Sequence, residues 1–105
     1  MIELHRNGQR LAIAGELTIY HAAEVHAALV PLYAETELDI DLSGVSEFDT
    51  SGVQVLLLAK REMAQAGHAL RLSGHSQAVL DVFALLELGG LFGDPQLLPA
   101  GGAPA

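Results

Sequence analysis

The sequence predicts an α/β fold with a partly parallel sheet. Two short stretches that alternate apolar and polar residues flank Asn7-Gly8, a dipeptide typical of hairpin turns. Behind them, segments with strand periodicity alternate with segments of helical periodicity, an order that favours parallel strand pairs. The 105 residues are 50% hydrophobic and 17% charged, which is typical of one globular domain.

The first half of the chain predicts a strand pair and a helix. The strands are expected at 2–6 and 10–15. From Thr18 the pattern becomes helical, and the helix should start after "TIY". Pro31 is expected to kink or end this helix. Its apolar stripe consists of Ala22, Val25, Leu29 and Leu32.

The second half predicts a central strand at 37–45, because "ELDIDLSGV" alternates cleanly. A helix should follow and stop at Gly67, a residue suited to the position after a helix end. The remaining predicted segments are a strand at 68–74, a third helix at 76–88 stopped by Gly89-Gly90, and a short closing segment at 91–98. We expect one domain over 1–95 and a flexible tail over 96–105, where the composition is simple.

Charge and composition exclude several classes of function. Thirteen carboxylates against five Lys and Arg give a net charge of −8, which argues against nucleic acid or an anionic membrane as a partner. The absence of cysteine excludes thiol catalysis, thiolate metal sites and disulfides, and fits a reducing cytosol. No apolar run resembles a signal peptide or a membrane span. A cytoplasmic location is therefore expected, without membrane insertion.

The sequence "DTSG" stands at the mouth of the second predicted helix. Asp49, Thr50 and Ser51 can each accept from the unpaired N–H groups of a helix start, so the plain interpretation is an N-cap. A cap needs one oxygen, however, and Gly52 in a first turn costs up to about 1 kcal/mol relative to alanine. The hydroxyl groups therefore remain candidates for a cap, a nucleophile or a switch.

A helical wheel at about 100° per residue divides this second helix into two faces. Val53, Leu56, Met63 and Ala64 cluster on a predicted core face. On another side, the Ser51 hydroxyl group shares a surface with apolar residues. A surface of this composition is typical either of a partner-binding site or of a second core face. The residues on that side are Ser51, Val55, Leu58 and Glu62, next to Gln54, Arg61 and Gln65.

The unit "DLSGVSEFDTSGVQVLLLAKR" resembles the signature of the STAS family of sulfate-transporter and anti-sigma-factor-antagonist domains. "GELTIYHAAEVHAAL" is similar to the first-helix segment of that family, and "GHALRLSGHSQAVLDVFALLELGGLF" to its last strand, last helix and closing turn. The likeness covers about residues 9–95 in order. It implies a mixed sheet of four or five strands with helices packed mainly on one side.

The resemblance implies a phosphorylation switch. In the bacterial antagonists of this family, a kinase-type anti-sigma factor phosphorylates a hydroxyl in the turn and a phosphatase restores it. Carried to this chain, the phosphoacceptor is Ser51 first and Thr50 second, and Asp49 holds the turn. The residues expected to shape the turn or contact the partner are Asp49, Gly52, Val55, Leu58 and Glu62.

Enzyme-like motifs are weak by comparison. "GHSQA" imitates a nucleophile elbow, but no histidine follows His75 and the chain is too short for that fold, so Ser76 is expected to cap the third helix. "DTSG" interrupts the aspartic-protease motif, and no phosphate-cradling loop is present. The five histidines offer no i, i+4 pair and are interpreted as scattered surface residues: His5, His21, His26, His68 and His75.

Two functions remain open. The first is a non-enzymatic phospho-switch module that binds a serine kinase and phosphatase in a partner-switching pathway controlling a sigma factor or a chemosensory output. The second is a cytoplasmic accessory subunit of an ABC-type phospholipid transporter that contacts the ATPase through Thr50. Neither requires a cofactor or a metal. The sequence leaves open whether the protein is a monomer or a dimer.

Overall fold

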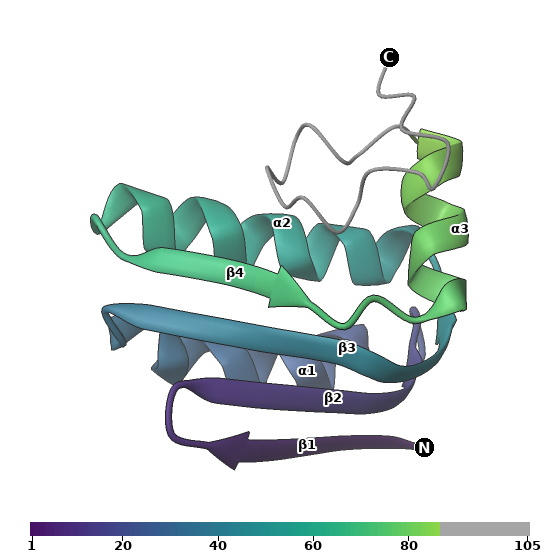
Figure 1. Ribbon diagram of the computed structural model, residues 1–105, viewed down its shortest axis with the longest axis horizontal. Coiled ribbons are helices and arrows are strands. Elements are labelled where there is room, and N and C mark those ends of the chain that lie inside the picture. The colour runs from purple at the N-terminus through teal and green to yellow at the C-terminus, as the bar shows by residue number, and fades with distance from the viewer. Residues whose placement is uncertain (87–105) are drawn as a thin grey trace.

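The computed structural model describes residues 1–86, which form one mixed sheet and three α-helices (Figure 1). The sheet order is β1-β2-β3-β4, with β1 antiparallel to β2 and both other pairs parallel. This confirms the predicted mixed sheet. The predicted helix stop at Gly89-Gly90, the closing segment and the tail lie outside the described residues. In chain order the elements are β1 Ile2–Asn7, β2 Arg10–Leu17, α1 Ala22–Leu29, the 3₁₀ helix η1 Val30–Ala34, β3 Glu37–Phe48, α2 Thr50–Gln65, β4 Ala69–Ser73 and α3 Gln77–Leu86.

The predicted hairpin forms, with its turn one residue later than the dipeptide indicated. Asn7 pairs with Arg10, so the two loop residues are Gly8 and Gln9. Gly8 has a φ of +64°, a conformation that glycine adopts without steric cost. The short connection makes β1 the outer neighbour of β2.

The central strand β3 is confirmed and extends three residues beyond its predicted end, to Phe48. It lies between β2 and β4 and runs parallel to both. Two register shifts against β2 interrupt the pairing, between Ala12 and Ala14 and between Gly15 and Glu16. Such bulges bend a strand and re-aim its side chains. β3 continues past them to Phe48, and α2 starts at Thr50.

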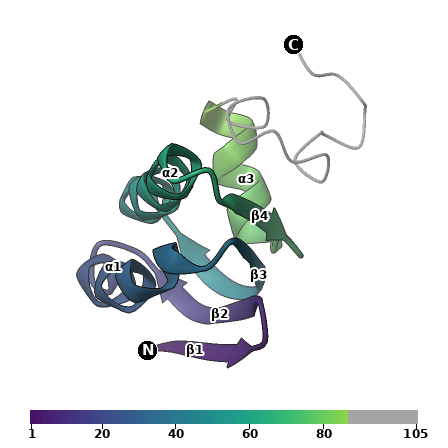
Figure 2. The ribbon, with the colours of Figure 1, turned by 90° about the vertical axis from the view of Figure 1, so that its left-hand side faces the viewer.

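Helices α1 and α2 cover one face of the sheet, as Figure 2 shows. The side chains between these layers are the most deeply buried of the described residues, and at β3 they alternate with exposed or half-buried ones. The core is therefore one layer between sheet and helices. Its fully buried large side chains are Phe83, Ile13, Leu17, Leu29, Leu38, Ile40, Leu42, Leu56, Met63, Leu72 and Val25.

Pro31 ends the first α-helix rather than kinking it. The α-helical hydrogen bonds stop at Leu29, and the chain continues as η1 with Pro31 in its first turn. Proline is tolerated there because a first-turn N–H has no partner within the helix. Leu32 is consequently half-buried rather than part of the inner stripe.

Helix α2 has a wider buried face than the wheel predicted. Val53, Leu56 and Met63 are buried as expected, but Ala64 is exposed, so its assignment to the core was wrong. Val55 is buried instead, with an exposed fraction of 7%. The sheet and α1 together cover a face of α2 that includes Val55 and leaves Ala64 exposed.

Helix α3 lies across the end of the sheet at which β3 finishes and α2 begins (Figure 1). Phe83 of α3 packs on Phe48, with ring centroids 5.7 Å apart. Ser76 caps this helix, because its hydroxyl oxygen accepts from the Val79 N–H at 3.3 Å. The prediction of a structural rather than nucleophilic Ser76 agrees with this geometry.

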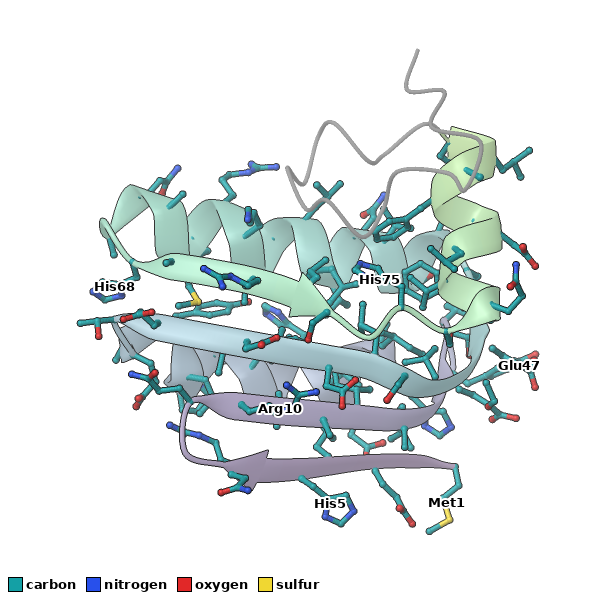
Figure 3. All side chains as sticks on the ribbon, in the orientation of Figure 1. Met1, His5, Arg10, Glu47, His68 and His75 are labelled. Carbon is teal, nitrogen blue, oxygen red and sulfur yellow. The ribbon has the colours of Figure 1, made fainter. Side chains whose placement is uncertain are left out.

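The other face of the sheet carries charged side chains, and no helix within residues 1–86 lies above them. Arg10, labelled in Figure 3, reaches Asp41 at 2.9 Å and Asp39 at 3.7 Å. Burial alone would raise the pKa of Asp41, but hydrogen bonds from Ser43 and Arg10 outweigh it and the pKa is lowered. Asp41 therefore stabilises the fold above the pKa of the unfolded chain, and this contribution disappears as the pH falls through the folded-state pKa.

Replacing Ile40 by alanine should destabilise the protein by about 2–5 kcal/mol, since Ile40 is fully buried in the central strand. Ile19→Ala is the matched control, because Ile19 is 69% exposed and its loss should stay within about 0.5 kcal/mol. Urea denaturation of both variants measures the difference. Equal losses would contradict the position of the core.

Candidate functional site

Asp49 organises the junction between β3 and α2. Its backbone is extended, and its Oδ1 accepts from the N–H groups of Ser51 at 2.9 Å and Gly52 at 3.2 Å. Its Oδ2 accepts from the Ile19 N–H at 3.1 Å, in the loop between β2 and α1. One carboxylate thus caps α2 and also ties this loop to the helix mouth.

The hydroxyl groups of Thr50 and Ser51 are not needed for the cap. Asp49 supplies the side-chain acceptor, and neither hydroxyl group makes a hydrogen bond to residues 1–86. Thr50 is exposed and Ser51 is half-buried. The structure therefore assigns the capping role to Asp49 and leaves two accessible hydroxyl groups in the first turn of α2.

Gly52 is required by close packing rather than by backbone freedom. A Cβ atom at this position would lie 2.5 Å from the Leu17 carbonyl oxygen and 2.7 Å from the Phe48 ring. Real Cβ atoms do not approach neighbours so closely, so the β2 end and the Phe48 ring need a glycine here. This contact explains why a residue of poor helix propensity stands in the first turn.

Ile19 and Tyr20 form an exposed apolar pair beside the turn, and sequence analysis missed their role. Their exposed fractions are 69% and 86%. The Asp49 hydrogen bond to the Ile19 N–H places the pair next to the helix mouth. The available signal was "TIY", in which two large apolar residues stand in succession between a strand and a helix without contributing to either pattern.

The predicted contact residues of α2 occupy different environments. Gly52 and Val55 are buried, with an exposed fraction of 7% for Val55. Their expected part in the turn or in partner contact stays a prediction. Leu58 is half-buried and Glu62 is exposed. Val55 and Leu58 also contribute to a groove of about 440 Å³ beside α2, lined by His26, Gln54, Val55, Leu57, Leu58 and Arg61.

Carboxylates surround the helix mouth. Glu16 and Glu47 are register partners at the ends of β2 and β3, and Asp49 follows Glu47 by two residues. The Met1 ammonium group lies 3.2 Å from Glu16 and is the main cause that lowers the pKa of the Glu16 carboxyl group. A hydrogen bond with Glu47 and the nearby His21 lower the pKa of Glu16 further. These carboxylates would repel an added negative charge on Ser51 or Thr50.

The five histidines differ in exposure. His5 is exposed, while His21, His26, His68 and His75 are half-buried. His68 Nδ1 lies 2.9 Å from the Tyr33 carbonyl oxygen, and His75 packs edge-on against Phe83. Within residues 1–86, His, Asp and Glu side chains form no group of three suited to a metal ion.

The helices described here are also too short or too polar to cross a bilayer: none within residues 1–86 combines the length and the apolar character that a membrane span requires.

Comparison with known proteins gives the family. A family model described as "Mlab, STAS domain" matches residues 1–99. The chain belongs to the STAS domain family.

The relatives agree with the fold. The anti-sigma-B factor antagonist of Bacillus subtilis (strain 168) is 28% identical over 88 residues, which cover 83% of this chain and 81% of the relative. The unphosphorylated anti-sigma factor antagonist SpoIIAA superposes with a TM-score of 0.70 at 24% identity, over 90% of this chain and 87% of that one. Its phosphorylated form, the Bacillus cell fate determinant, gives 0.65 at 23% identity over 90% of each chain.

Asp49→Ala and Asp49→Asn should separate the two roles of the carboxylate. Alanine removes the cap and the loop contact, and should cost about 0.5–2 kcal/mol for the cap alone. Asparagine keeps one acceptor oxygen for the helix but presents an N–H₂ group to the Ile19 N–H. Amide hydrogen exchange should therefore quicken at Ile19 in both variants, and at Ser51 and Gly52 only in the alanine variant. Unchanged protection of Ile19 would contradict the bridge.

Gly52→Ala should destabilise the protein by about 1–3 kcal/mol, because the new methyl group overpacks against Leu17 and Phe48. Helix propensity predicts the opposite sign, a gain of up to about 1 kcal/mol. Ser51→Ala, in the same turn, is the control and should change stability by less than about 0.5 kcal/mol. Chemical denaturation distinguishes the two signs, and a stabilised Gly52→Ala protein would disprove the close contact.

Proposed function

We propose that this protein is a non-enzymatic binding module of the anti-sigma factor antagonist type, switched by phosphorylation in the turn formed by Asp49, Thr50, Ser51 and Gly52. The observation that carries the proposal is the division of roles at the helix mouth. Asp49 alone caps α2, so two hydroxyl groups are left accessible without a structural task. The similarity to an anti-sigma-B factor antagonist supports this function.

Ser51 is the first candidate for the phosphoacceptor and Thr50 the second. The Asp49 carboxylate holds the Ser51 amide at 2.9 Å, which fixes the residue in one position while its side chain stays partly accessible. A kinase needs a hydroxyl group that it can approach and align. Thr50 is more exposed, and its amide N–H is not one of the groups that Asp49 holds.

Phosphorylation should leave the fold intact and change the surface. A phosphate adds about −1.5 to −2 charge and three acceptor oxygens. The first turn of a helix accommodates an anion, because its free N–H groups and its dipole favour negative charge. Outside the helix, the dianion would stand beside Glu47 and Asp49 and next to the exposed pair Ile19 and Tyr20.

The apolar residues next to the turn form the proposed partner-binding surface. Exposed aromatic and aliphatic side chains are the usual anchors of protein interfaces, provided that they become desolvated on binding. Tyr20 and Ile19 meet this description in the unmodified protein. A hydrated dianion beside them hinders desolvation and repels an acidic partner. The switch thus acts on affinity for a kinase-type partner, in a cytoplasmic pathway that controls a sigma factor or a chemosensory output.

A second candidate function is an accessory subunit of an ABC-type phospholipid transport complex. Two observations favour it: Thr50 is the more exposed hydroxyl-bearing residue, and the matching family model carries the description Mlab. In this function Thr50 contacts the ATPase without being phosphorylated. Both functions use the same helix mouth, so the identity of the bound partner distinguishes between them.

The double variant Ser51→Asp, Thr50→Asp should lose its partner and keep its fold. Tagged protein is captured from its own cells, and the bound proteins are identified by mass spectrometry. Wild type should recover a histidine-kinase-like ATPase or a phosphatase, and the acidic variant should recover at least about tenfold less, equivalent to 1.4 kcal/mol. Thr36→Asp is the matched control, since Thr36 is exposed at the opposite end of β3.

The outcomes separate the two functions. Recovery of an ABC ATPase with its permease, lost in Thr50→Ala and kept in Ser51→Ala, would replace the first function by the second. An acidic variant whose circular dichroism melt shows an unfolded chain would disprove a switch that acts on the surface alone. Phosphate found by intact-mass measurement on wild type and absent from Ser51→Ala would identify the acceptor.

A further inference from the structure

Strand β1 forms one edge of the sheet, and no element within residues 1–86 pairs with its outer side. The strand order places β1 outermost, beside β2 alone (Figure 2). An unpaired edge presents a row of N–H and C=O groups that can bind another strand. The question is which groups of β1 point outward and which strand they fit.

The pairing with β2 identifies the outward groups. In an antiparallel pair, residues that exchange hydrogen bonds alternate with residues that do not. The Glu16 N–H donates to the Met1 carbonyl oxygen at 3.3 Å. Every second residue from Met1 onward therefore bonds to β2 through its backbone. The residues between them have their backbone N–H and C=O groups directed away from the sheet: Ile2, Leu4 and Arg6.

We propose that β1 pairs with β1 of a second copy of this chain, antiparallel and around a two-fold axis at Leu4. Leu4 then lies opposite the partner's Leu4, and Ile2 lies opposite the partner's Arg6. All outward groups of both strands are used, in about six backbone hydrogen bonds. A two-fold contact of this kind is closed, since the same patch serves both copies. The result is one continuous sheet across two copies.

The polar side chains of β1 favour this register. Between the hydrogen-bonded pairs, Glu3 lies opposite the partner's His5 on both sides of the axis. These side chains are exposed and already lie 3.6 Å apart within one strand, so they can approach each other across strands. A shift of the axis to Glu3 or to His5 would place like side chains opposite each other, which is destabilising for charged residues, and would leave outward groups unpaired.

Leu4 gives the contact its apolar centre. It is half-buried and packs against the core from the edge of the sheet. The partner's Leu4 would cover its remaining surface. A strand pair alone buries less than the roughly 1,000 Å² expected of a stable interface, so association should be weak and concentration-dependent. The pairing uses the edge opposite to β4 and is independent of the switch at α2.

The mass of the protein in solution tests the pairing. Sedimentation velocity on wild type, from about 1 µM to about 1 mM, should show a monomer at the low end and a dimer at the high end. Leu4→Pro should remain a monomer throughout, because it removes an outward N–H and none that bonds to β2. Proline is tolerated at such an edge position, and an unchanged thermal melt would show that the fold is intact.

A charge swap provides the control. His5→Glu places carboxylates opposite each other, so this variant should shift the dimerisation midpoint at least about tenfold upward in concentration. The double variant Glu3→Lys, His5→Glu places opposite charges across the axis and should recover the wild-type midpoint. A wild type that stays monomeric at every concentration would overturn the proposal. So would a dimer that persists in Leu4→Pro, or a double variant that fails to recover.

Discussion

The carboxylate of Asp49 is the interaction on which the candidate site depends. Its two oxygens serve different parts of the chain: one closes the N-terminus of α2, and the other holds the loop between β2 and α1. A hydroxyl group at this position could satisfy the helix, but it has no second oxygen atom to direct at the loop. Because a single charged group does both, the exposed pair Ile19 and Tyr20 is fixed beside the first turn of α2. The surface and the turn become one site.

The same arrangement frees the hydroxyl groups of Thr50 and Ser51. In many helices a serine or threonine is consumed as the cap, as Ser76 is at the start of α3. At α2 the cap is acidic, and the hydroxyl-bearing residues follow it. A phosphate on either of them would lie between the positive end of the helix dipole on one side and carboxylates on the other. Under the proposed function, the fold would tolerate this modification and the affinity for a partner would change.

The one-sided placement of α1 and α2 has consequences for the rest of the sheet. On the face that α1 and α2 leave free, Arg10 forms ion pairs with Asp39 and Asp41 across β2 and β3. The edge strand β1 combines a half-buried leucine with charges of opposite sign, rather than the like charges that commonly protect an edge. The helix mouth and the strand edge therefore present two separate surfaces of different chemistry.

The order and type of the elements could be predicted from the sequence, because periodicity and end signals are local. The hairpin, the central strand at 37–45, the end of a helix near Pro31, an N-cap within "DTSG" and the cap at Ser76 all depend on neighbours within a few residues. The helical wheel showed which residues of α2 share a face, but the width of the covered arc depends on how α1 and the sheet pack. Val55 consequently entered the core and Ala64 remained outside. The packing reason for Gly52 and the position of Ile19 and Tyr20 required the tertiary structure. Both follow from the parallel pairing of β2 with β3, which brings segments some thirty residues apart to the same end of the sheet.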